Sequence, residues 1–547
     1  MELLRLRSNV SLFCRQGKQG TKPLRVVDIL DENSVENLVL NDNAFKLLSN
    51  VRASPPFWQQ KKKEVMGMVR QLGMPSLFLT LSAAETQWPE LIKILYKVLK
   101  NREITLKEAG ELSWMEKAEL IRKDPITCSR YFDHRMRTMI YQVLSKENGP
   151  FKENRIIDYY YRIEFQHRGS PHVHCIFWLA DTPRYIRGNA QSKEKCEEFI
   201  DAYITTDKDL SPYSKYQHHK HTHTCYTNKR NVCRFNMPHP PLKKTMILEP
   251  LPDNIDIRKH EKHLSQIKEQ LNCKDFAQRY SSLDEFLVSL AMTEDSYILA
   301  LRSSLKVPKV FLKRATKDVS INYYNAEIIN LHRANMDIQF ILDPYACVSY
   351  IVNYVGKAQK GMSKLLQNII QQSREGKISI KEQLKSVANT FVNCAEVSAQ
   401  ETAYHILGMP MSVSSRGSMY INTSPPSERV RLVKSKKDLA SMDKDSEDIY
   451  SSNMIDYYKA RPKSLEGLCL AEFCAWFTYK NNKKNQDSNE DAHDQEEDTN
   501  GKVYTLLNRK GLVYRRTKAK IIRYRRYQHE EDQSNYYREM LMLFSPL

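Results

Sequence analysis

The sequence lacks several features that would place it in common protein classes. No apolar run approaches the roughly 20 residues that a membrane-spanning helix needs, and no signal-peptide core follows Met1. Its 11 cysteines are odd in number and irregularly spaced, which argues against a disulfide framework and favours a reducing compartment. No Gly-x-x-x-x-Gly-Lys-Ser/Thr phosphate loop is present, so we expect no ATP hydrolysis. These absences predict a soluble intracellular protein without a membrane partner.

Positive charge is what the chain has in excess. Its 84 Lys and Arg residues exceed its 65 acidic residues, giving a formal net charge of +19. Such an excess favours a polyanionic partner, first of all nucleic acid. The 30 tyrosines supply ring faces on which unpaired bases can stack. With 547 residues, 41% of them hydrophobic, the chain can bury the cores of about two to four domains.

Residues 159–179 carry the first chemical signal. Two β-prone runs flank a short break that contains Gly169 and Pro171, a pattern that predicts a hairpin. In the second run His172 and His174 are separated by one residue, so both imidazoles leave the same face of the strand. An isolated pair of this kind is more often only the polar face of a strand.

The register of this hairpin decides which residues share the histidine face. If Gln166 pairs with His172, then Glu164 pairs with His174, and all four polar groups lie on one face. In the alternative register Phe165 and His167 stand opposite the two histidines instead. Imidazoles with an amide or carboxylate oxygen suit a divalent metal ion of intermediate hardness.

Residues 344–357 follow the period of a helix. Tyr350, Tyr354 and Lys357 fall at i, i+4 and i+7, on one helical stripe. Two phenols on one stripe are, by themselves, more often core aromatics than nucleophiles. Beside a metal-polarised phosphate, however, a tyrosine can attack and a lysine can stabilise the developing charge.

The histidine pair and the tyrosine helix together resemble the HUH superfamily of single-strand nicking enzymes. The surrounding sequence looks like the replication-initiator domain of Helitron transposases, and the resemblance covers nearly the whole chain. One matching phrase is Pro171-His172-Val173-His174. The others occupy residues 52–58, 75–85, 164–166, 233–238, 398–401, 421–423, 460–463 and 536–538. We would not expect this order of phrases by chance.

The resemblance implies metal-dependent nicking and strand transfer on single-stranded DNA. A phenol oxygen of Tyr350 or Tyr354 would attack a phosphate, leaving a 5′-phosphotyrosine and a free 3′-hydroxyl, while Lys357 assists electrostatically. The implied ligands of Mg²⁺ or Mn²⁺ are His172, His174 and Gln166, with Glu164 in reserve.

A second candidate metal site lies in a His-rich insertion. Two cysteines and two histidines on loop-like sequence satisfy the preference of Zn²⁺ for four nitrogen and sulfur ligands. The resemblance points to His219, His221, Cys225 and Cys233, with His218 and His223 as spares. We expect a structural zinc ion that staples an insertion with little core. The alternative is a solvated His-rich loop with two free cysteines.

The resemblance predicts an α+β fold. An antiparallel sheet of the HUH or rolling-circle initiator type would be flanked by helices, with a zinc-stapled insertion and a helical C-terminal region. The predicted parts are a lead-in at 1–50, a nuclease domain at 51–424 with the His/Cys-rich insertion at 205–250, and a C-terminal region at 425–547 with an acidic low-complexity linker at 485–500 and a basic aromatic segment at 503–547.

Two segments are candidates for DNA contact. Residues 77–82 predict a buried strand that resembles the first motif of rolling-circle initiators, and its Thr80 and Ser82 could contact the strand to be cut. Residues 515–527 interleave cations with aromatics, which is typical of a nucleic-acid contact or of a nuclear address. The candidates there are Arg515, Arg516, Arg523 and Arg525. We therefore expect a nuclear protein.

Helitron transposases usually continue into a helicase, and the missing phosphate loop predicts an initiator part without that motor. A helicase would then be supplied separately. A catalytically inactive remnant that only binds single-stranded DNA is the alternative reading of the same features. A structural zinc protein without a role on DNA would account only for residues 217–233.

Overall fold

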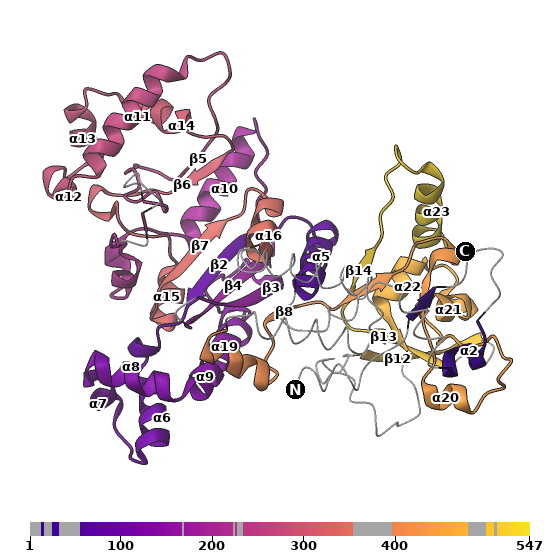
Figure 1. The fold of residues 1–547 in the computed structure, drawn as a ribbon. Coiled ribbons are helices and arrows are strands. Elements are labelled where there is room, and N and C mark those ends of the chain that lie inside the picture. The colour runs from indigo at the N-terminus through magenta and orange to yellow at the C-terminus, as the bar shows by residue number, and fades with distance from the viewer. Residues whose placement is uncertain are drawn as a thin grey trace, which may run out of the picture. The chain divides into compact units, whose positions relative to one another are not determined.

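The computed structural model describes residues 13–15, 24–31, 55–166, 169–222, 225–226, 233–353, 397–479, 499–507 and 511–546. The chain divides into two compact units (Figure 1). Unit 1 comprises Met1–Gly73, Val348–Glu396 and Ser415–Leu547, and unit 2 comprises Met74–Cys347 and Val397–Ser414. Unit 1 thus combines segments from both ends of the chain, a combination that the sequence pattern did not predict.

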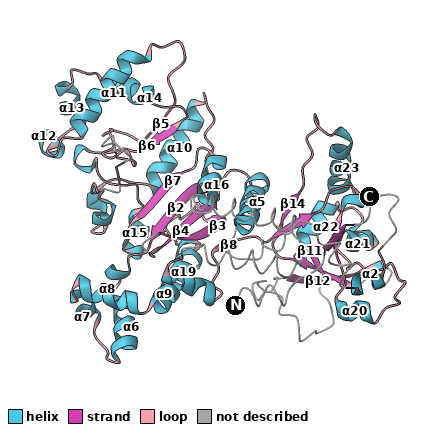
Figure 2. Ribbon diagram, in the orientation of Figure 1, coloured by secondary structure: helices cyan, strands magenta, loops and turns pink. Residues whose placement is uncertain are grey.

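A five-stranded antiparallel sheet forms the centre of unit 2, in the order β7-β2-β4-β3-β8 (Figure 2). This confirms the predicted α+β fold with an antiparallel sheet flanked by helices. The strands are β2 Leu77–Ser82, β3 Ile156–Phe165, β4 Pro171–Leu179, β7 Met336–Phe340 and β8 Ser412–Ser414.

The two faces of this sheet differ in chemistry because side chains alternate along each strand. On one face, aligned apolar side chains of four strands are buried: Leu77, Leu79, Leu81, Tyr161, Ile163, Val173, Cys175, Phe177, Met336, Ile338 and Phe340. The other face carries polar side chains toward the end of the sheet where β2 stops and β4 starts. The candidate functional site lies on this polar face.

Helices flank the sheet, and most begin at a residue whose side chain accepts a hydrogen bond from the first turn. Thr105, Ser113, Asp124, Asn325 and Ser398 are such caps. The helices are α6 Pro89–Lys100, α7 Leu106–Glu111, α8 Trp114–Lys123, α9 Pro125–Arg137, α10 Ala190–Tyr203, α15 Ala326–His332 and α19 Ala399–Ile406. Helix α16, Pro344–Asn353, follows β7 and crosses the boundary between the units.

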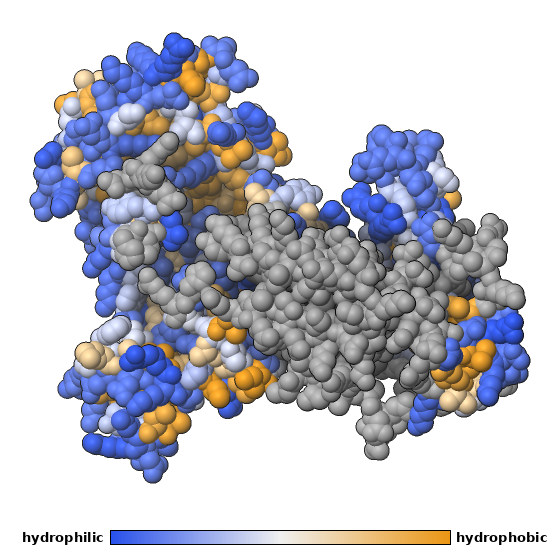
Figure 3. All heavy atoms as spheres, in the orientation of Figure 1, coloured by the Kyte–Doolittle hydropathy of each residue, from blue (hydrophilic) through white to orange (hydrophobic). Residues whose placement is uncertain are grey.

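A separate helical group in unit 2 has its own core. Ile267, Phe286, Tyr297 and Ala300 are fully buried at its centre. Its elements are α11 Ile257–Leu271, α12 Phe276–Arg279, α13 Leu283–Ser289 and α14 Glu294–Ser303, beside the short pair β5 Met246–Leu248 and β6 Lys309–Phe311. On the face shown in Figure 3, hydrophilic residues predominate over unit 2 and apolar residues form scattered groups.

The C-terminal region corrects the prediction that it is helical, because unit 1 holds strands as well as helices. In the sequence, the cations at 515–516 and 523 made the neighbouring β-prone residues hard to recognise as strands. Val513, Ile521 and Ile522 are buried. The strands are β1 Phe13–Arg15, β9 Ser418–Ile421, β10 Val430–Leu432, β11 Phe477–Tyr479, β12 Thr499–Thr505, β13 Leu512–Arg516 and β14 Ile521–Tyr524. The helices are α2 Val26–Leu30, α5 Pro55–Leu72, α20 Lys436–Ala440, α21 Met454–Lys459, α22 Leu470–Trp476 and α23 Gln533–Phe544.

Helix α5 is tied to the C-terminal strands of unit 1. The side-chain amide of Gln71 accepts from the backbone nitrogen of Ile522 at 3.0 Å and donates to its carbonyl at 2.6 Å. Among the described helices of both units, none combines the length and the apolar character that crossing a membrane requires.

Candidate functional site

The two histidines of β4 lie between strands β2 and β3 on the polar face of the sheet. His172 stands opposite Ser82 on β2 and Glu164 on β3, and His174 stands opposite Thr80 and Arg162. Glu164 therefore shares the histidine face, as the first of the two predicted registers requires. The pairing is nevertheless shifted by two residues relative to that register.

The shift has a local cause in the hairpin turn. Strand β3 ends at Phe165, which pairs with Pro171, so the alternative register with Phe165 opposite a histidine is wrong. Gln166 already belongs to the turn, because its carbonyl accepts from the backbone nitrogen of Gly169 at 2.7 Å. Gly169 has a φ of +91°, which a residue with a side chain rarely adopts. Gln166 is exposed beyond the strand, and Glu164 takes the place beside the histidines.

The hydroxyl groups of β2 fix the orientation of both imidazoles. Ser82 Oγ lies 2.8 Å from His172 Nδ1, and Thr80 Oγ1 lies 2.9 Å from His174 Nδ1. These two residues were predicted to contact DNA, and the structure instead places their hydroxyls on the histidines. At His172, a Ser82 hydroxyl that accepts from Nδ1–H leaves the Nε2 lone pair available to a metal ion, whereas Nε2 of His174 faces a carboxylate.

Glu164 completes this group. Its Oε2 lies 2.8 Å from His174 Nε2. Burial alone would raise the pKa of Glu164, but the hydrogen bond with His174 and the charges of His174 and Arg162 outweigh it, so the net shift is downward. Burial, with a smaller contribution from His174, lowers the pKa of His172 to about 4. An ionised carboxylate thus lies beside a neutral imidazole at neutral pH, the donor set that a divalent cation accepts.

The predicted nucleophiles fall at the edge of the described structure. Tyr350 lies on α16, while Tyr354 and Lys357 lie outside the described residues. Helix α16 starts shortly after β7, and Asp343 Oδ1 fixes its first turn by accepting from the backbone nitrogens of Tyr345 and Ala346 at 2.9 and 3.0 Å. The catalytic role of the two tyrosines and the lysine stays a prediction.

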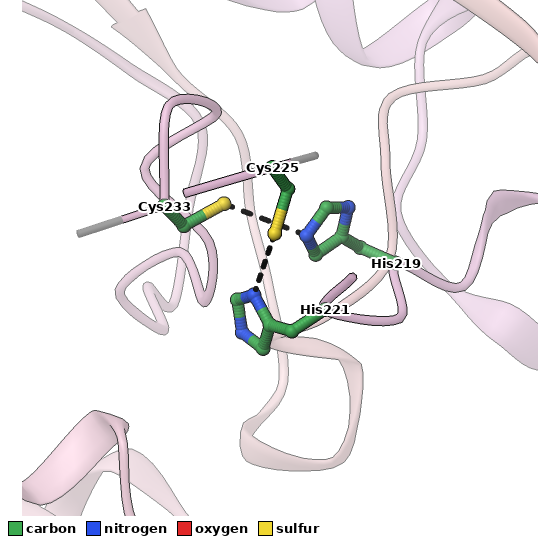
Figure 4. Close-up of side chains that lie close together, drawn as sticks. All are labelled: His219, His221, Cys225 and Cys233. Carbon is green, nitrogen blue, oxygen red and sulfur yellow. Dashed lines mark hydrogen bonds between the residues drawn. The ribbon is translucent and has the colours of Figure 1, made fainter. Parts of the chain in front are cut away.

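The four predicted zinc ligands come together in the insertion (Figure 4). One ligand atom from each of His219, His221, Cys225 and Cys233 lies within 4.8 Å of the others. Cys225 Sγ is 3.5 Å from His221 Nδ1, and Cys233 Sγ is 3.4 Å from His219 Nε2. Both cysteines are buried. Two nitrogens and two sulfurs converge, so the group could hold a metal ion, and we call it the His/Cys group.

Backbone bonds hold the segments that carry these ligands. The backbone nitrogen of His219 donates to Ser320 O at 2.8 Å, and that of Arg234 donates to Cys225 O at 2.8 Å. The ring of His221 stacks on Tyr226 with centroids 5.5 Å apart. Burial, then the neighbouring His221 and His218, lower the pKa of His219, which favours its neutral form. Of the two spare histidines, His223 lies outside the described residues.

Comparison with known families places the N-terminal part of the chain. Residues 4–177 match the model of the Helitron helicase-like domain at the N-terminus. The matched part of the chain is similar to Helitron-related proteins. The matched residues include β2, β3 and both histidines of β4, whereas the His/Cys group and α16 lie beyond them. No curated protein matches the chain.

Sequence reasoning missed the residues that hold the end of β2. Buried His332 places Nε2 2.9 Å from the carbonyl oxygen of Ser82. The backbone nitrogen of Ser82 donates to Asn335 O at 3.0 Å. The carbonyl, the amide and the hydroxyl of Ser82 are therefore all bonded, which fixes the hydroxyl that holds His172. A single histidine at the end of a helix gives no pattern from which this role could be predicted.

The basic residues predicted to contact DNA divide into buried and accessible side chains. Arg516 is buried, and its Nη1 donates to the carbonyls of Cys474 and Ala475 at 3.0 and 3.1 Å, which corrects its assignment as a DNA contact. Arg523 is half-buried and donates to Ser418 Oγ at 3.1 Å. Arg515 lies over the ring of Trp476, and Arg525 is exposed.

Proposed function

We propose that this Helitron-related protein is an HUH-type endonuclease. It would nick single-stranded DNA and transfer the strand during rolling-circle transposition, acting in the nucleus. The observation that carries the proposal is the polar face of the five-stranded sheet. There His172 and His174 stand side by side, held by hydroxyls at Nδ1 and flanked by the carboxylate of Glu164.

The donor set fits a divalent metal ion. A bound Mg²⁺ or Mn²⁺ would polarise a phosphate oxygen and stabilise the charge that develops in the transition state. His172, His174 and Glu164 would hold it, with Glu164 replacing the predicted Gln166. With the ion bound, the hydroxyls of Thr80 and Ser82 would accept from Nδ1–H of both imidazoles, and His174 would have to give up the Nε2 proton that Glu164 accepts without the ion.

The chemical step would use the tyrosine helix. The phenol oxygen of Tyr350 or Tyr354 would bond to phosphorus as the P–O3′ bond breaks, and the 3′ oxygen would take up a proton. Because an unperturbed phenol has a pKa of about 10, it must lose its proton during the attack, and Lys357 would stabilise the charge. The phosphotyrosine conserves the bond energy, so a 3′-hydroxyl can rejoin the strand without ATP.

We also propose that the His/Cys group binds Zn²⁺ as a structural ion. Its two imidazoles and two thiols match the tetrahedral preference of Zn²⁺, while the site on the sheet offers a carboxylate in place of thiols and so suits a harder cation. The ion would close an insertion whose own buried cluster contains only Cys225, Cys233 and Met237 among the described residues.

The decisive experiment is incubation with labelled single-stranded oligonucleotides and Mn²⁺, followed by denaturing electrophoresis. The parent should form a covalent adduct, and mass spectrometry should find the nucleotide on Tyr350 or Tyr354. Tyr350→Phe and Tyr354→Phe should each retain part of the cleavage, and the double variant should form no adduct. Tyr345→Phe is the matched control, because this exposed tyrosine lies at the start of α16.

Other outcomes would contradict the mechanism. Nucleotide on Tyr345 or on a serine would sink the assignment of the nucleophiles. Binding of the oligonucleotide without any adduct at any divalent metal concentration would favour an inactive remnant that only binds single-stranded DNA.

A further inference from the structure

A pair of stacked tyrosines with two cations lies close to the end of β2. The rings of Tyr213 and Tyr216 are 6.2 Å apart and inclined by only 14°. The guanidinium of Arg333 lies 5.7 Å from the first ring, and the ammonium of Lys215 lies 5.3 Å from the second. The 3₁₀-helix η4, Ser214–Gln217, explains the stack, because side chains three residues apart eclipse in this conformation. We call these four residues the tyrosine surface.

The tyrosine surface is anchored to the strands that carry the candidate nuclease site. The hydroxyl of Tyr216 donates to Gln87 Oε1 at 3.3 Å, on the short helix η1, Glu85–Gln87, that follows β2. The amide of the buried residue Gln217 lies against the backbone of Met336, and in the orientation that satisfies both groups it accepts from Met336 N at 2.9 Å and donates to Met336 O at 2.7 Å. Met336 begins β7 and pairs with Leu81. The surface therefore lies at the end of the sheet that also carries His172.

The second cation is anchored to the same end. Arg333 directly follows His332, whose Nε2 bonds the carbonyl of Ser82. Its backbone has a φ of 55°, which is uncommon outside glycine, and its side chain is 45% exposed. Arg333 forms an ion pair with Glu90 at 3.6 Å, and both side chains of the pair are exposed. Exposed pairs of this kind contribute little, so a phosphate can replace the carboxylate.

We infer that the tyrosine surface binds the bases of the single strand that enters the site of His172. This inference rests on the proposed function. Every base has a π face, so partly exposed tyrosine rings can stack with unpaired bases of any sequence. Arg333 and Lys215 neutralise the phosphates between those bases. A duplex keeps its bases stacked on each other, so the surface selects single strands.

The test is the affinity for a fluorescent oligonucleotide, measured by anisotropy without divalent metal and without chelator. The double variant Tyr213→Ala/Tyr216→Ala should bind about tenfold or more weakly, within the range found for the loss of stacked bases. The double Phe variant keeps both rings and should bind like the parent. Tyr280→Ala is the matched control, because Tyr280 packs in an aromatic group with Phe276 and Phe286 in the separate helical core of unit 2.

An oligonucleotide with abasic positions separates stacking from charge. It should bind the parent as weakly as the intact oligonucleotide binds the double Ala variant, and that variant should lose little more when the bases are removed. If the parent binds intact and abasic strands equally, the inference is overturned, even if the Ala variant fails to fold. Unchanged binding by a folded double Ala variant would overturn it as well.

The same assays distinguish this inference from the proposed function. Base-dependent binding through Tyr213 and Tyr216 without a covalent adduct would support the role of the tyrosine surface and contradict the proposed nuclease activity. Adduct formation by the parent together with base-independent binding would support the nuclease activity and contradict the role of the tyrosine surface.

Discussion

Two His-x-His segments of this chain lie in different chemical environments. His172 and His174 project from one face of a central strand, with hydroxyl oxygens at 2.8 and 2.9 Å and a carboxylate beside them. His219 and His221 lie on a loop and meet the thiols of Cys233 and Cys225. The same spacing therefore combines two imidazoles with a carboxylate in one place and two imidazoles with two thiols in the other. The partners, rather than the spacing, decide which metal each pair suits.

The two sites also differ in what holds them. The first is built into a five-stranded sheet whose opposite face carries a layer of buried, largely apolar side chains, so its geometry does not depend on a bound ion. The second collects its ligands from short loop segments around a very small buried cluster. A metal ion at the second site would therefore stabilise the fold, whereas one at the first would serve the reaction.

The largest effect is expected from a substitution that disrupts the site of His172 and His174 alone. His172→Ala should abolish the covalent adduct while the zinc content and the affinity for single-stranded DNA stay close to those of the parent. The reason is that the imidazole acts on one phosphate, whereas the strand is held by other groups. Denaturing electrophoresis, metal analysis and anisotropy on one preparation check all three. A loss of zinc as large as that of a His219→Ala variant would show that the two sites are not separate.

The converse substitution should break the second site. Cys233→Ser keeps the size of the side chain but removes a thiolate, so zinc content and thermal stability should fall together, by on the order of 4 kcal/mol of unfolding free energy. Cys273→Ser is the control, because Cys273 is a half-buried cysteine outside the His/Cys group. Metal analysis without chelators and a thermal melt measure both quantities. Absence of stoichiometric zinc in the parent would remove the proposal.

These two sites show how far the sequence alone leads. Alternation predicted the hairpin and placed Glu164 on the histidine face, because a period of two survives a shift of register by two. The shift itself depended on how tightly the chain turns at Gly169. Because of the shift, Glu164 and not Gln166 stands opposite His172. In the His/Cys group, the family resemblance selected the four residues that the fold brings together.

Other features could not be predicted because they depend on segments distant in the sequence. The hydroxyls of Thr80 and Ser82 gain their role only when β2 pairs with β4. Arg516 looked like a DNA contact in a basic run, and only the packing of β13 against α22 shows its guanidinium bound to carbonyls. The helical prediction for the C-terminal region was wrong because the cations of residues 515–527 obscured the short apolar runs of strands β13 and β14, in which Val513, Ile521 and Ile522 are buried.

A smaller effect should follow when only the support of the first site is removed. Thr80→Val and Ser82→Ala leave both histidines in place but free their Nδ1 atoms, so Mn²⁺ affinity at this site should fall about 10- to 100-fold. Thr182→Val is the control, because the Thr182 hydroxyl bonds that of Ser76 at 2.8 Å, just before β2 and away from the histidines. Titration of nicking with Mn²⁺ measures the shift. Equal metal dependence in all variants would mean that the hydroxyls do not orient the imidazoles.

The smallest expected effect concerns the pH dependence of stability, through His332. Burial, then the nearby charge of Arg135, lower its pKa to about 3 in the folded protein, whereas an unfolded histidine titrates near ~6.5. Below that pH the unfolded chain binds a proton that the folded one does not, so this histidine makes stability fall with decreasing pH, by at most about 1.4 kcal/mol per unit. Between pH 7.5 and 5.5 the loss should be about 1.4 kcal/mol.

His332→Gln should remove this part of the pH dependence, because an amide does not titrate but can still donate to the carbonyl of Ser82. His134→Gln, at an exposed position of α9, should leave the slope unchanged. Denaturant unfolding of the three proteins at several pH values measures the difference, and an identical slope in the His332→Gln variant and the parent would contradict it. The result would sharpen the contrast between the sites. Buried His332 holds the end of β2 and so supports the site of His172 and His174. The His/Cys group has only its own four ligands to hold it.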